Sequence, residues 1–456
     1  MKVAVVSLLF FVLSPFFALA KTPIAVIDSG LDIQHSDLSD RVWINDKERP
    51  NNSRDDDSNG YKDDVNGWNF AGNDNELIDY RFGDSFTSDV EKYFIIRAKL
   101  HAKLASNEEV AFLRTKSKDA DFLKTISTYG NYAHGTHVAG ISLGDAADLE
   151  VMGLKMIPTS RSVFTDLLRI SPENVGLVNV SGVSGRIDRA LKGMIRKFVR
   201  SQAMMLNKIA SYVNSFDVPV ANCSFGINMK HGALILRPVL DALSGGKASL
   251  ADLQRYSRFL VNEAIKAQKS FISTAPNTLF VIAAGNDGQD NSRYPIAPAN
   301  IDATNKITVA AVIDGRLARF SNYSGRLVDV AAPGVNIEST VPDGGLLAMS
   351  GTSQAAPYVA HTAGLIKEIN PDLTPERVRE LIMSTVDRLD QLKGKVLSGG
   401  IVNRERAIVA AEFVASGATF SQAISLSHDS IMPEKYSPKY DSVEDILPAI
   451  PLPSGF

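Results

Sequence analysis

Short runs of consecutive apolar residues alternate along this chain with longer stretches in which apolar residues recur every three or four positions. The first pattern is typical of buried parallel strands and the second of amphipathic helices. The expected strands are residues 23–27, 150–157, 218–225, 279–284, 306–312 and 327–331. Because strands that alternate with helices form parallel sheets covered on both faces, the expected fold class is α/β, a doubly wound and mainly parallel sheet flanked by helices.

The helical pattern predicts long helices over residues 186–213, 250–273 and 352–369, and a further helix that opens at residues 373–376. In the first of these, one apolar side collects Ile187, Leu191, Phe198, Met205 and Ile209. In the last, Pro375 suits the first helical turn, where its missing N–H costs nothing. Ligands of such folds bind beyond the carboxyl ends of the strands, so functional residues are expected there.

Residues 85–126 are expected to form a helical insertion. The segment Ser88-Asp89-Val90-Glu91 fits a capping box, and apolar residues follow at helical spacing at Tyr93, Ile96, Leu100 and Leu104. A separate short helix of small residues is expected to begin at His134. Residues 49–69 are polar, acidic and rich in asparagine, which predicts a loop.

The two ends of the chain differ from its body. Residues 1–20 combine the basic Lys2, an almost wholly apolar stretch and the small-residue site Ala18-Leu19-Ala20, as a secretory signal peptide does. An uncleaved membrane anchor is the alternative, which Pro15 and the short distance to the first strand disfavour. The expected organisation is a signal peptide over 1–20, one domain over 21–410 and a C-terminal extension over 411–456, Pro-rich at its end. Export to a secreted or periplasmic location follows, without stable membrane insertion after signal cleavage.

Bulk composition argues against several classes of function. The 456 residues are 45% apolar and 22% charged, the mix of a globular protein. A net charge of −3, from 48 basic and 51 acidic residues, gives no reason to expect nucleic acid as a partner. Cys223 is the one cysteine, so no intrachain disulfide can form, and a buried, inert thiol is expected.

Three segments carry the candidate chemistry. Residues 24–30 read Ile-Ala-Val-Ile-Asp-Ser-Gly, residues 134–140 read His-Gly-Thr-His-Val-Ala-Gly, and residues 351–357 read Gly-Thr-Ser-Gln-Ala-Ala-Pro. They supply a carboxylate at a strand end, Asp28, an imidazole, His134, and a hydroxyl at a helix N-terminus, Ser353. A serine hydroxyl is a weak nucleophile until a base accepts its proton. Neutral imidazole can accept it, and a carboxylate then fixes the tautomer and stabilises the imidazolium.

Each of these residues alone is more often structural: a turn Asp, a helix His or an N-cap Ser. Their joint occurrence resembles the three active-site signatures of the subtilisin-like serine proteases (subtilases, peptidase family S8), over about residues 23–410. The order Asp, His, Ser is that of subtilisin. The resemblance implies a subtilisin-like fold and a serine endopeptidase, a hydrolase that cleaves polypeptide substrates through an acyl-enzyme on Ser353. It implies no required cofactor, and it makes His134 the base and His137 structural.

Other segments share this resemblance. Residues 281–288 are similar to the family's oxyanion-hole segment, which places Asn286 where a side-chain amide stabilises the tetrahedral intermediate. Ser224, Phe225 and Gly226 resemble the edge segment that pairs with extended substrate by β-augmentation. The propeptide that most family members carry is not visible before the Asp28 strand. One hypothesis is that the C-terminal tail takes over part of its role.

The acidic loop resembles a cation site in part. Residues 55–64 have oxygen-bearing side chains at alternate positions and Gly60 at the sixth, as at the start of an EF-hand calcium loop, but Asn66 stands at the twelfth position in place of glutamate. Similar loops recur in the family, so a structural calcium ion and a solvated loop of Asx turns both stay open. Two other functions also stay open: a catalytically silent peptide-binding relative, and a transacylase or peptide ligase that uses the same acyl-enzyme.

Overall fold

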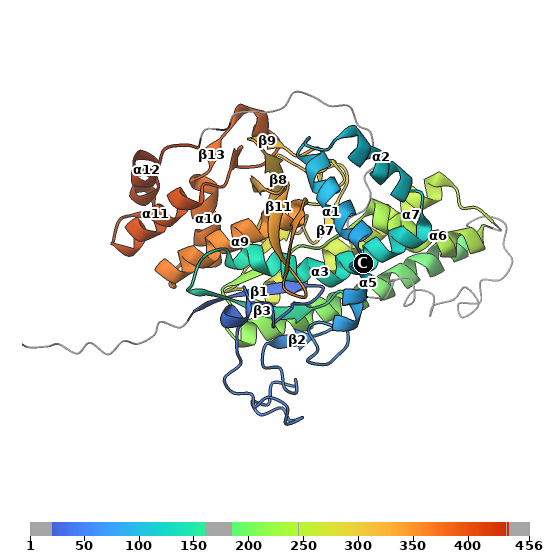
Figure 1. Ribbon diagram of the computed structural model, residues 1–456, viewed down its shortest axis with the longest axis horizontal. Helices are drawn as coiled ribbons and strands as arrows, with labels where there is room; N and C mark the ends of the chain where they lie inside the picture. Colours follow the sequence, from blue (N-terminus) through green and yellow to red (C-terminus); the bar gives the residue numbers. More distant parts are fainter. Residues whose placement is uncertain (1–20, 160–184, 245, 435, 437–456) are drawn as a thin grey trace, which may run out of the picture.

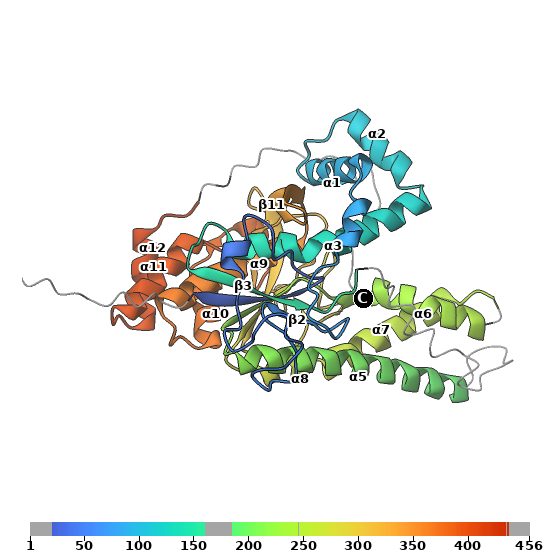
Figure 2. The ribbon, with the colours of Figure 1, turned by 60° about the horizontal axis from the view of Figure 1, so that its bottom comes forward.

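A central, mainly parallel sheet organises the fold. The computed structural model describes residues 21–159, 185–244, 246–434 and 436. The expected signal peptide over 1–20 and most of the Pro-rich end therefore lie outside the described residues. The strand order is β13-β14-β10-β8-β6-β4-β1-β3-β2, with β9 paired to β8. Helices cover both faces of this sheet (Figures 1 and 2). The expected α/β fold is confirmed.

The strands of the sheet follow the apolar runs of the sequence. They are β1 (Thr22–Asp28), β3 (Leu149–Lys155), β4 (Val220–Cys223), β6 (Leu279–Ala283), β8 (Lys306–Ile313) and β10 (Val330–Pro333), all parallel, with β2 (Gly67–Asn69) at one edge, β14 (Gly400–Ile401) and β13 (Asp387–Arg388) at the other, and the short β9 (Arg316–Leu317). Two expectations need correction. Strand β4 ends at Cys223, so Ser224 and Phe225 lie outside it, and the last three residues of the expected loop 49–69 form β2.

Alternate residues of β1 face opposite layers of helices. Ile24 and Val26 pack with α3 (Ala120–Leu143), α9 (Thr352–Ile369), α10 (Pro375–Ser384) and α11 (Arg404–Ala415). Ala25 and Ile27 pack with α5 (Gly185–Ser215) and α8 (Lys269–Thr274). In Figure 2, α5 runs below the sheet while α3 and α9 lie above it. Burial on both faces explains why these strands read as continuous apolar runs.

The helices outside the insertion match the sequence in part, and α11 and α12 (Phe420–Ser430) were not expected from it. Helices α5 and α9 follow the predicted ranges closely, and α10 begins at Pro375 with Thr374 as its N-cap. The helix expected over 250–273 is divided at Gln268 into α7 (Leu250–Ala267) and α8. Helix α6 (Met229–Leu243), which contains Pro238, was not expected from the sequence.

The insertion forms α1 (Ser88–His101) and α2 (Asn107–Lys116) and then runs directly into α3. Thr87 is the N-cap of α1, so the capping box expected at Ser88 is wrong; a capping box is present instead at the start of α2. His134 lies well inside α3, which Asp119 caps, so the expectation that a helix begins at His134 is also wrong. Buried tyrosines keep the helix continuous across Gly130, because they anchor both sides of it in the core.

Two small antiparallel sheets complete the described chain near the site. The first is a hairpin of β11 (Ile337–Val341) and β12 (Gly345–Met349), and the insertion packs on it. The second pairs β5 (Ile227–Asn228) with β7 (Ile296–Ala297), two strands far apart in the sequence. Short 3-10 helices are η1 (Ser39–Arg41), η2 (Tyr80–Ser85) and η4 (Asp390–Leu392). Within the described ranges, no helix combines the length and the apolar character needed to cross a lipid bilayer.

The C-terminal part of the described chain is packed on the sheet domain. Helix α11 runs through residue 410 and contacts α12 (Phe420–Ser430). The buried Arg406 side chain bonds to Asp387 at 2.7 Å and to the carbonyl oxygen of Ile431 at 2.9 Å. The backbone N–H of Glu434 also donates to Asp387. The folded unit therefore continues past 410 to at least Glu434.

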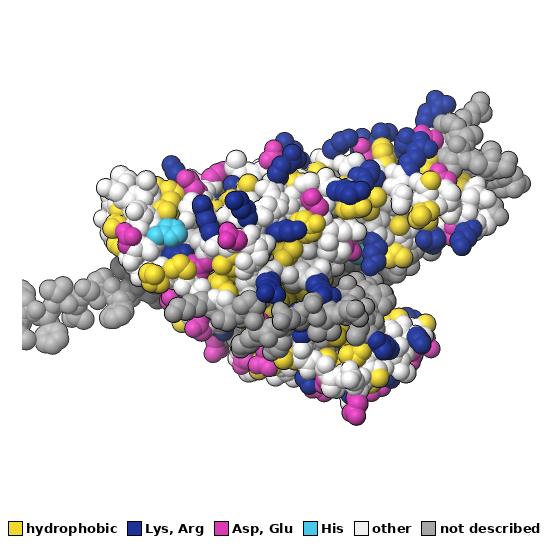
Figure 3. All heavy atoms as spheres, turned by 90° about the horizontal axis from the view of Figure 1, so that it is seen from above, with side chains coloured by type: hydrophobic (Ala, Val, Ile, Leu, Met, Phe, Trp, Pro, Cys, Tyr) yellow, Lys and Arg dark blue, Asp and Glu magenta, His cyan; other side chains and the backbone are white. Residues whose placement is uncertain are grey.

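Charged side chains are mixed on the face seen from above. There, Lys and Arg side chains lie among acidic and apolar ones along the length of the molecule (Figure 3). This distribution agrees with the near balance of 48 basic and 51 acidic residues in the sequence.

Candidate active site

Asp28 and His134 form a direct buried contact at the carboxyl end of β1. Asp28 is the last residue of that strand, and its Oδ1 lies 2.7 Å from His134 Nδ1 and also accepts the N–H of Ser29. Burial lowers the pKa of His134, but the charge of Asp28 and its hydrogen bond together outweigh burial and raise it above the ordinary value of 6.5. The parallel strand and α3 thus hold an acid–imidazole pair in fixed geometry.

Ser353 stands in the first turn of α9. Its side chain is almost buried, and its hydroxyl donates to the carbonyl oxygen of Ser224 at 3.2 Å. The Ser224 hydroxyl donates in turn to the carbonyl oxygen of Ser353 at 3.1 Å. His134 and Gln354, the residue after Ser353, line one pocket. Ser353 is therefore the direct neighbour of a residue that shares a pocket with His134, and its own hydroxyl is turned to the Ser224 carbonyl.

Asn286 is tied to the start of α9 by its side-chain oxygen. Asn286 Oδ1 accepts from the N–H of Thr352 at 2.8 Å and from the Thr352 hydroxyl at 2.9 Å. The same hydroxyl accepts the N–H of Gly285, whose φ of 107° favours glycine. Since the oxygen end of the amide is bound to protein, its NH₂ end is the part that can serve a ligand. Sequence reasoning found Asn286 but not Thr352, which orients it.

Ser224, Phe225 and Gly226 form an irregular segment between β4 and β5. This segment lies beyond the carboxyl end of β4, and Ser224 touches Ser353 through the two bonds above. A side chain in place of Gly226 would meet Ile296 and the carbonyl oxygen of Ala297 at 3.0 and 3.1 Å. The packing of this segment against β7 therefore favours a residue without Cβ at position 226.

Two other residues near the site are inaccessible. His137 is fully buried and its Nε2 lies 2.8 Å from the carbonyl oxygen of Leu347, and burial lowers its pKa to about 4 despite that bond. Cys223 is a free, buried thiol whose pKa is raised by burial and by the charge of Asp28. Both observations agree with the interpretation of these residues as structural.

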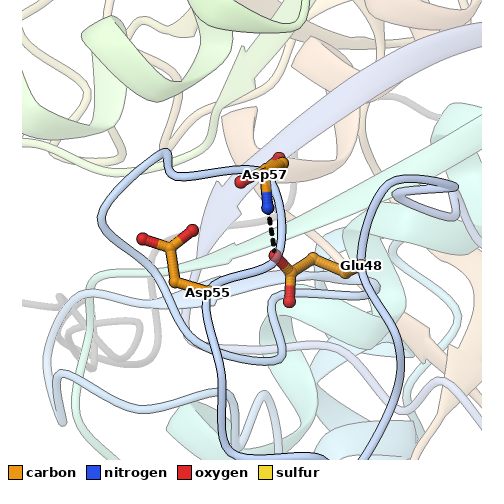
Figure 4. Close-up of side chains that lie close together, drawn as sticks. All are labelled: Glu48, Asp55 and Asp57. Atoms are coloured by element: carbon orange, nitrogen blue, oxygen red, sulfur yellow. Dashed lines mark hydrogen bonds between the residues drawn. The ribbon is translucent and has the colours of Figure 1, made fainter.

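The acidic loop gathers three carboxylates, but not in the arrangement of an EF-hand. Ligand oxygens of Glu48, Asp55 and Asp57 lie within 4.8 Å of one another (Figure 4). Glu48 precedes the loop and was missed from the sequence, while Asn66 donates its amide to the carbonyl oxygen of Trp43. Burial raises the pKa of Glu48, although backbone N–H groups of Asp57 and Asp56 bond to its carboxylate. An oxygen-only, acidic donor set of this kind fits a hard cation such as calcium.

Comparison with known proteins identifies the family of this chain. The sequence model described as the subtilase family matches residues 20–405. The chain belongs to the subtilase family. The expected resemblance to the subtilases, a family of serine peptidases, is thereby confirmed.

Curated relatives of this subtilase are proteases of parasites and bacteria. It is 25% identical over 399 residues to Subtilisin-like protease 1 of Plasmodium falciparum (isolate 3D7), covering 85% of this chain and 43% of that protein. It is 36% identical over 135 residues to Alkaline elastase YaB of Bacillus sp. (strain YaB), covering 30% and 34% of the two chains. This subtilase thus spans less than half the length of these curated relatives.

Two of the solved structures to which the chain is similar are described as proteases. A cold adapted subtilisin-like serine proteinase has 20% identity and a TM-score of 0.43 over 84% of this chain and 86% of that one. The Epidermin Leader Peptide Processing Serine Protease from Staphylococcus aureus has 16% identity and a TM-score of 0.46 over 88% and 77%.

Proposed function

We propose that this subtilase is an exported serine endopeptidase that hydrolyses peptide bonds of polypeptide substrates through an acyl-enzyme on Ser353. The observation that carries the proposal is the buried 2.7 Å contact between Asp28 and His134. The signature serine stands at the start of α9, and the residue after it, Gln354, lines one pocket with His134. This is the set of groups that nucleophilic acyl transfer needs: an acid that orients, a base and a hydroxyl.

The reaction begins when His134 Nε2 accepts the Ser353 proton as Oγ attacks the scissile carbonyl carbon. Rotation of the serine side chain away from the Ser224 carbonyl brings the hydroxyl to the imidazole. Asp28 holds the Nδ1–H tautomer and stabilises the imidazolium that forms. The same stabilisation of the charged form is the reason that Asp28 raises the pKa of His134. The imidazolium then donates its proton to the leaving amine, and a water molecule activated by the same imidazole hydrolyses the acyl-enzyme.

The oxyanion of each tetrahedral intermediate is stabilised by donors of two elements. The NH₂ group of Asn286 supplies one hydrogen bond, and the N–H of Ser353 at the positive end of α9 supplies the other. Residues of the substrate that precede the scissile bond pair with Ser224, Phe225 and Gly226, whose segment follows β4. This main-chain pairing gives affinity that does not depend on substrate sequence.

Export follows from the secretory pattern of residues 1–20, which would direct the mature enzyme to a secreted or periplasmic location. The two alternatives keep the same site. A silent peptide-binding relative is disfavoured by the intact pair of Asp28 and His134. A transacylase or ligase would require an amine to replace water at the acyl-enzyme.

Labelling with a fluorophosphonate, beside hydrolysis of casein, tests the proposal on the mature protein. The Ser353→Ala variant is expected to lose labelling and about a millionfold in turnover, the loss measured in subtilisin itself. Ser257→Ala is the matched control, because Ser257 is buried on α7 and its hydroxyl has no hydrogen-bond partner in the described structure. Labelling without hydrolysis would favour a ligase or a narrow specificity, and folded protein that does not label would refute the proposal.

A further inference from the structure

The main-chain carbonyl of Ser353 cannot receive the hydrogen bond that an α-helix normally gives it. In an α-helix each carbonyl oxygen accepts from the N–H of the residue four positions later. For Ser353, in the first turn of α9, that residue is Pro357, which has no N–H and whose ring crowds the carbonyl four positions before it. Ser353 is 6% exposed, and a buried carbonyl without a donor is costly. The signature serine therefore needs a donor from outside its own helix.

The hydroxyl of Ser224 is that donor. Ser224 is 5% exposed, and its Oγ lies 3.1 Å from the carbonyl oxygen of Ser353. A second bond runs the other way, from the Ser353 hydroxyl to the carbonyl oxygen of Ser224 at 3.2 Å. The proposed reaction breaks this second bond, since the Ser353 hydroxyl must turn to His134. Of the two bonds, only the one from the Ser224 hydroxyl can then hold the main chain of the nucleophile.

Asn222 determines where the Ser224 hydroxyl points. Asn222 is fully buried in β4, and its Nδ2 donates to Ser224 Oγ at 2.9 Å. A serine hydroxyl has one hydrogen to donate. Because Ser224 Oγ accepts from the amide, its hydrogen is left for the carbonyl of Ser353. The three groups form a directed chain in which the amide donates to the hydroxyl and the hydroxyl donates to the carbonyl.

The central sheet holds the start of this chain rigidly. Asn222 pairs with Val26 of β1 on one side and with Val281 of β6 on the other. Both valines are buried in the cluster that includes residues of α9, so Asn222 faces that helix. Strand β1 also ends at Asp28. The same rigid sheet therefore positions the carboxylate directly and the signature serine through the chain of hydrogen bonds.

We propose that Asn222 and the hydroxyl of Ser224 are positioning residues for the nucleophile. They replace the helical bond that Pro357 removes, and they keep the main chain of Ser353 in place while its side chain turns to His134. The inference rests on the proposed peptidase function. The N–H of Ser353, the second proposed oxyanion donor, belongs to the residue that is held, so the alignment of the oxyanion depends on the same bond.

The first test compares Ser224→Ala with the wild-type, full-length protein. The variant keeps the main chain that would pair with substrate and loses only the hydroxyl. We expect kcat and the rate constant of fluorophosphonate labelling to fall together by about 2- to 13-fold, the factor for one neutral hydrogen bond, with KM nearly unchanged.

Asn305→Ala is the matched control for a buried polar side chain. Asn305 lies just before β8, at the amino ends of the strands, and its amide donates to three carbonyl oxygens there. This variant should lower the free energy of unfolding without changing kcat or the labelling rate.

A rescue by the main chain distinguishes positioning from a general structural role. Pro357→Ala restores an N–H four residues after Ser353, which makes the Ser224 hydroxyl dispensable. Ser224→Ala should therefore cause a smaller loss of kcat and of labelling in the Pro357→Ala protein than in the wild type. Asn222→Ala should lower both rates in the wild type and cause no further loss in Ser224→Ala, because it acts through that hydroxyl.

The outcomes separate this inference from the proposed function. Unchanged kcat and labelling in Ser224→Ala, or an equal loss in the wild type and in Pro357→Ala, would overturn the inference, while labelling of the wild type would still support the peptidase. If Pro357→Ala does not fold, Asn222→Ala and Ser224→Ala decide: losses that add would overturn the inference. Folded wild-type protein that does not label refutes the proposed function, and the inference with it.

Discussion

Replacing Thr352 by valine tests the link between α9 and Asn286, the proposed oxyanion donor. Thr352 is fully buried, and its hydroxyl and its N–H both donate to Asn286 Oδ1, at 2.9 and 2.8 Å. Valine keeps the shape and the N–H but removes the hydroxyl. The amide of Asn286 then loses one of the two bonds that orient it, and the N–H of Gly285 loses its acceptor.

The expected magnitudes differ for catalysis and for stability. One neutral hydrogen bond contributes about 0.5–1.5 kcal/mol, which lowers kcat by about 2- to 13-fold if the bond is needed in the transition state. The unpaired N–H of Gly285 costs about 1–3 kcal/mol of the free energy of unfolding. Asn286→Ala removes the donor itself, and the corresponding change in subtilisin costs about 10²–10³ in kcat.

The assay is a double-mutant cycle on a fluorogenic peptide, with urea unfolding measured in parallel. Thr352→Val should lower kcat in the wild type but cause no further loss of kcat in Asn286→Ala. Thr362→Val is the control: it is also fully buried on α9, and its hydroxyl donates within the helix to the carbonyl oxygen of Tyr358. It should affect stability alone. An equal loss of kcat with and without the Asn286 amide would refute the reasoning.

Three further predictions follow from charged groups. Burial lowers the pKa of His134, but the charge of Asp28 and its hydrogen bond outweigh burial and raise it. In a pH–rate profile, kcat/KM should therefore rise with pH with a midpoint above 6.5, and Asp28→Asn should lower that midpoint. A wild-type midpoint below 6.5 contradicts this prediction. Arg406→Met leaves Asp387 buried without its cation and should lower the free energy of unfolding in urea by about 3–5 kcal/mol. Lys266→Met removes one member of a surface pair and should change that free energy little. Calcium should raise the melting temperature of the protein, and the rise should be larger at about pH 7.5 than at about pH 5. The reason is that burial raises the pKa of Glu48, so protons compete with the ion at the lower pH. An equal rise in the Glu48→Gln variant would exclude this site.

The sequence predicted the parts of the site that local chemistry determines. Asp28 ends an apolar run, so a strand could be expected to deliver it to the carboxyl edge of the sheet, where the structure places it. The segment Gly351-Thr352-Ser353 begins a helix as expected, because small and polar residues favour a helix start. Asn286 follows β6 in the same way.

The features of the site that could not be predicted from the sequence depend on contacts between distant segments of the chain. Gly130 and Asn131 suggest a break before His134, but burial of Tyr129 and Tyr132 outweighs that local preference. Glu48 joins the acidic loop only after the chain turns back, and no spacing rule includes it. The position of α1, which lines one pocket with His134, was equally invisible, since it depends on packing against a hairpin more than two hundred residues away.

Helix α3 has a consequence for how this enzyme could be re-engineered. It is a single helix of 24 residues, about 36 Å long, that begins in the insertion and ends past His134. An insertion joined by two loops can be excised or exchanged as a cassette. Here the C-terminal end of the insertion lies within helix α3. Each residue added or removed in α3 before His134 therefore rotates the imidazole about the helix axis by about 100°. An exchange of the insertion between relatives would therefore have to preserve the helical phase of α3 as well as its length.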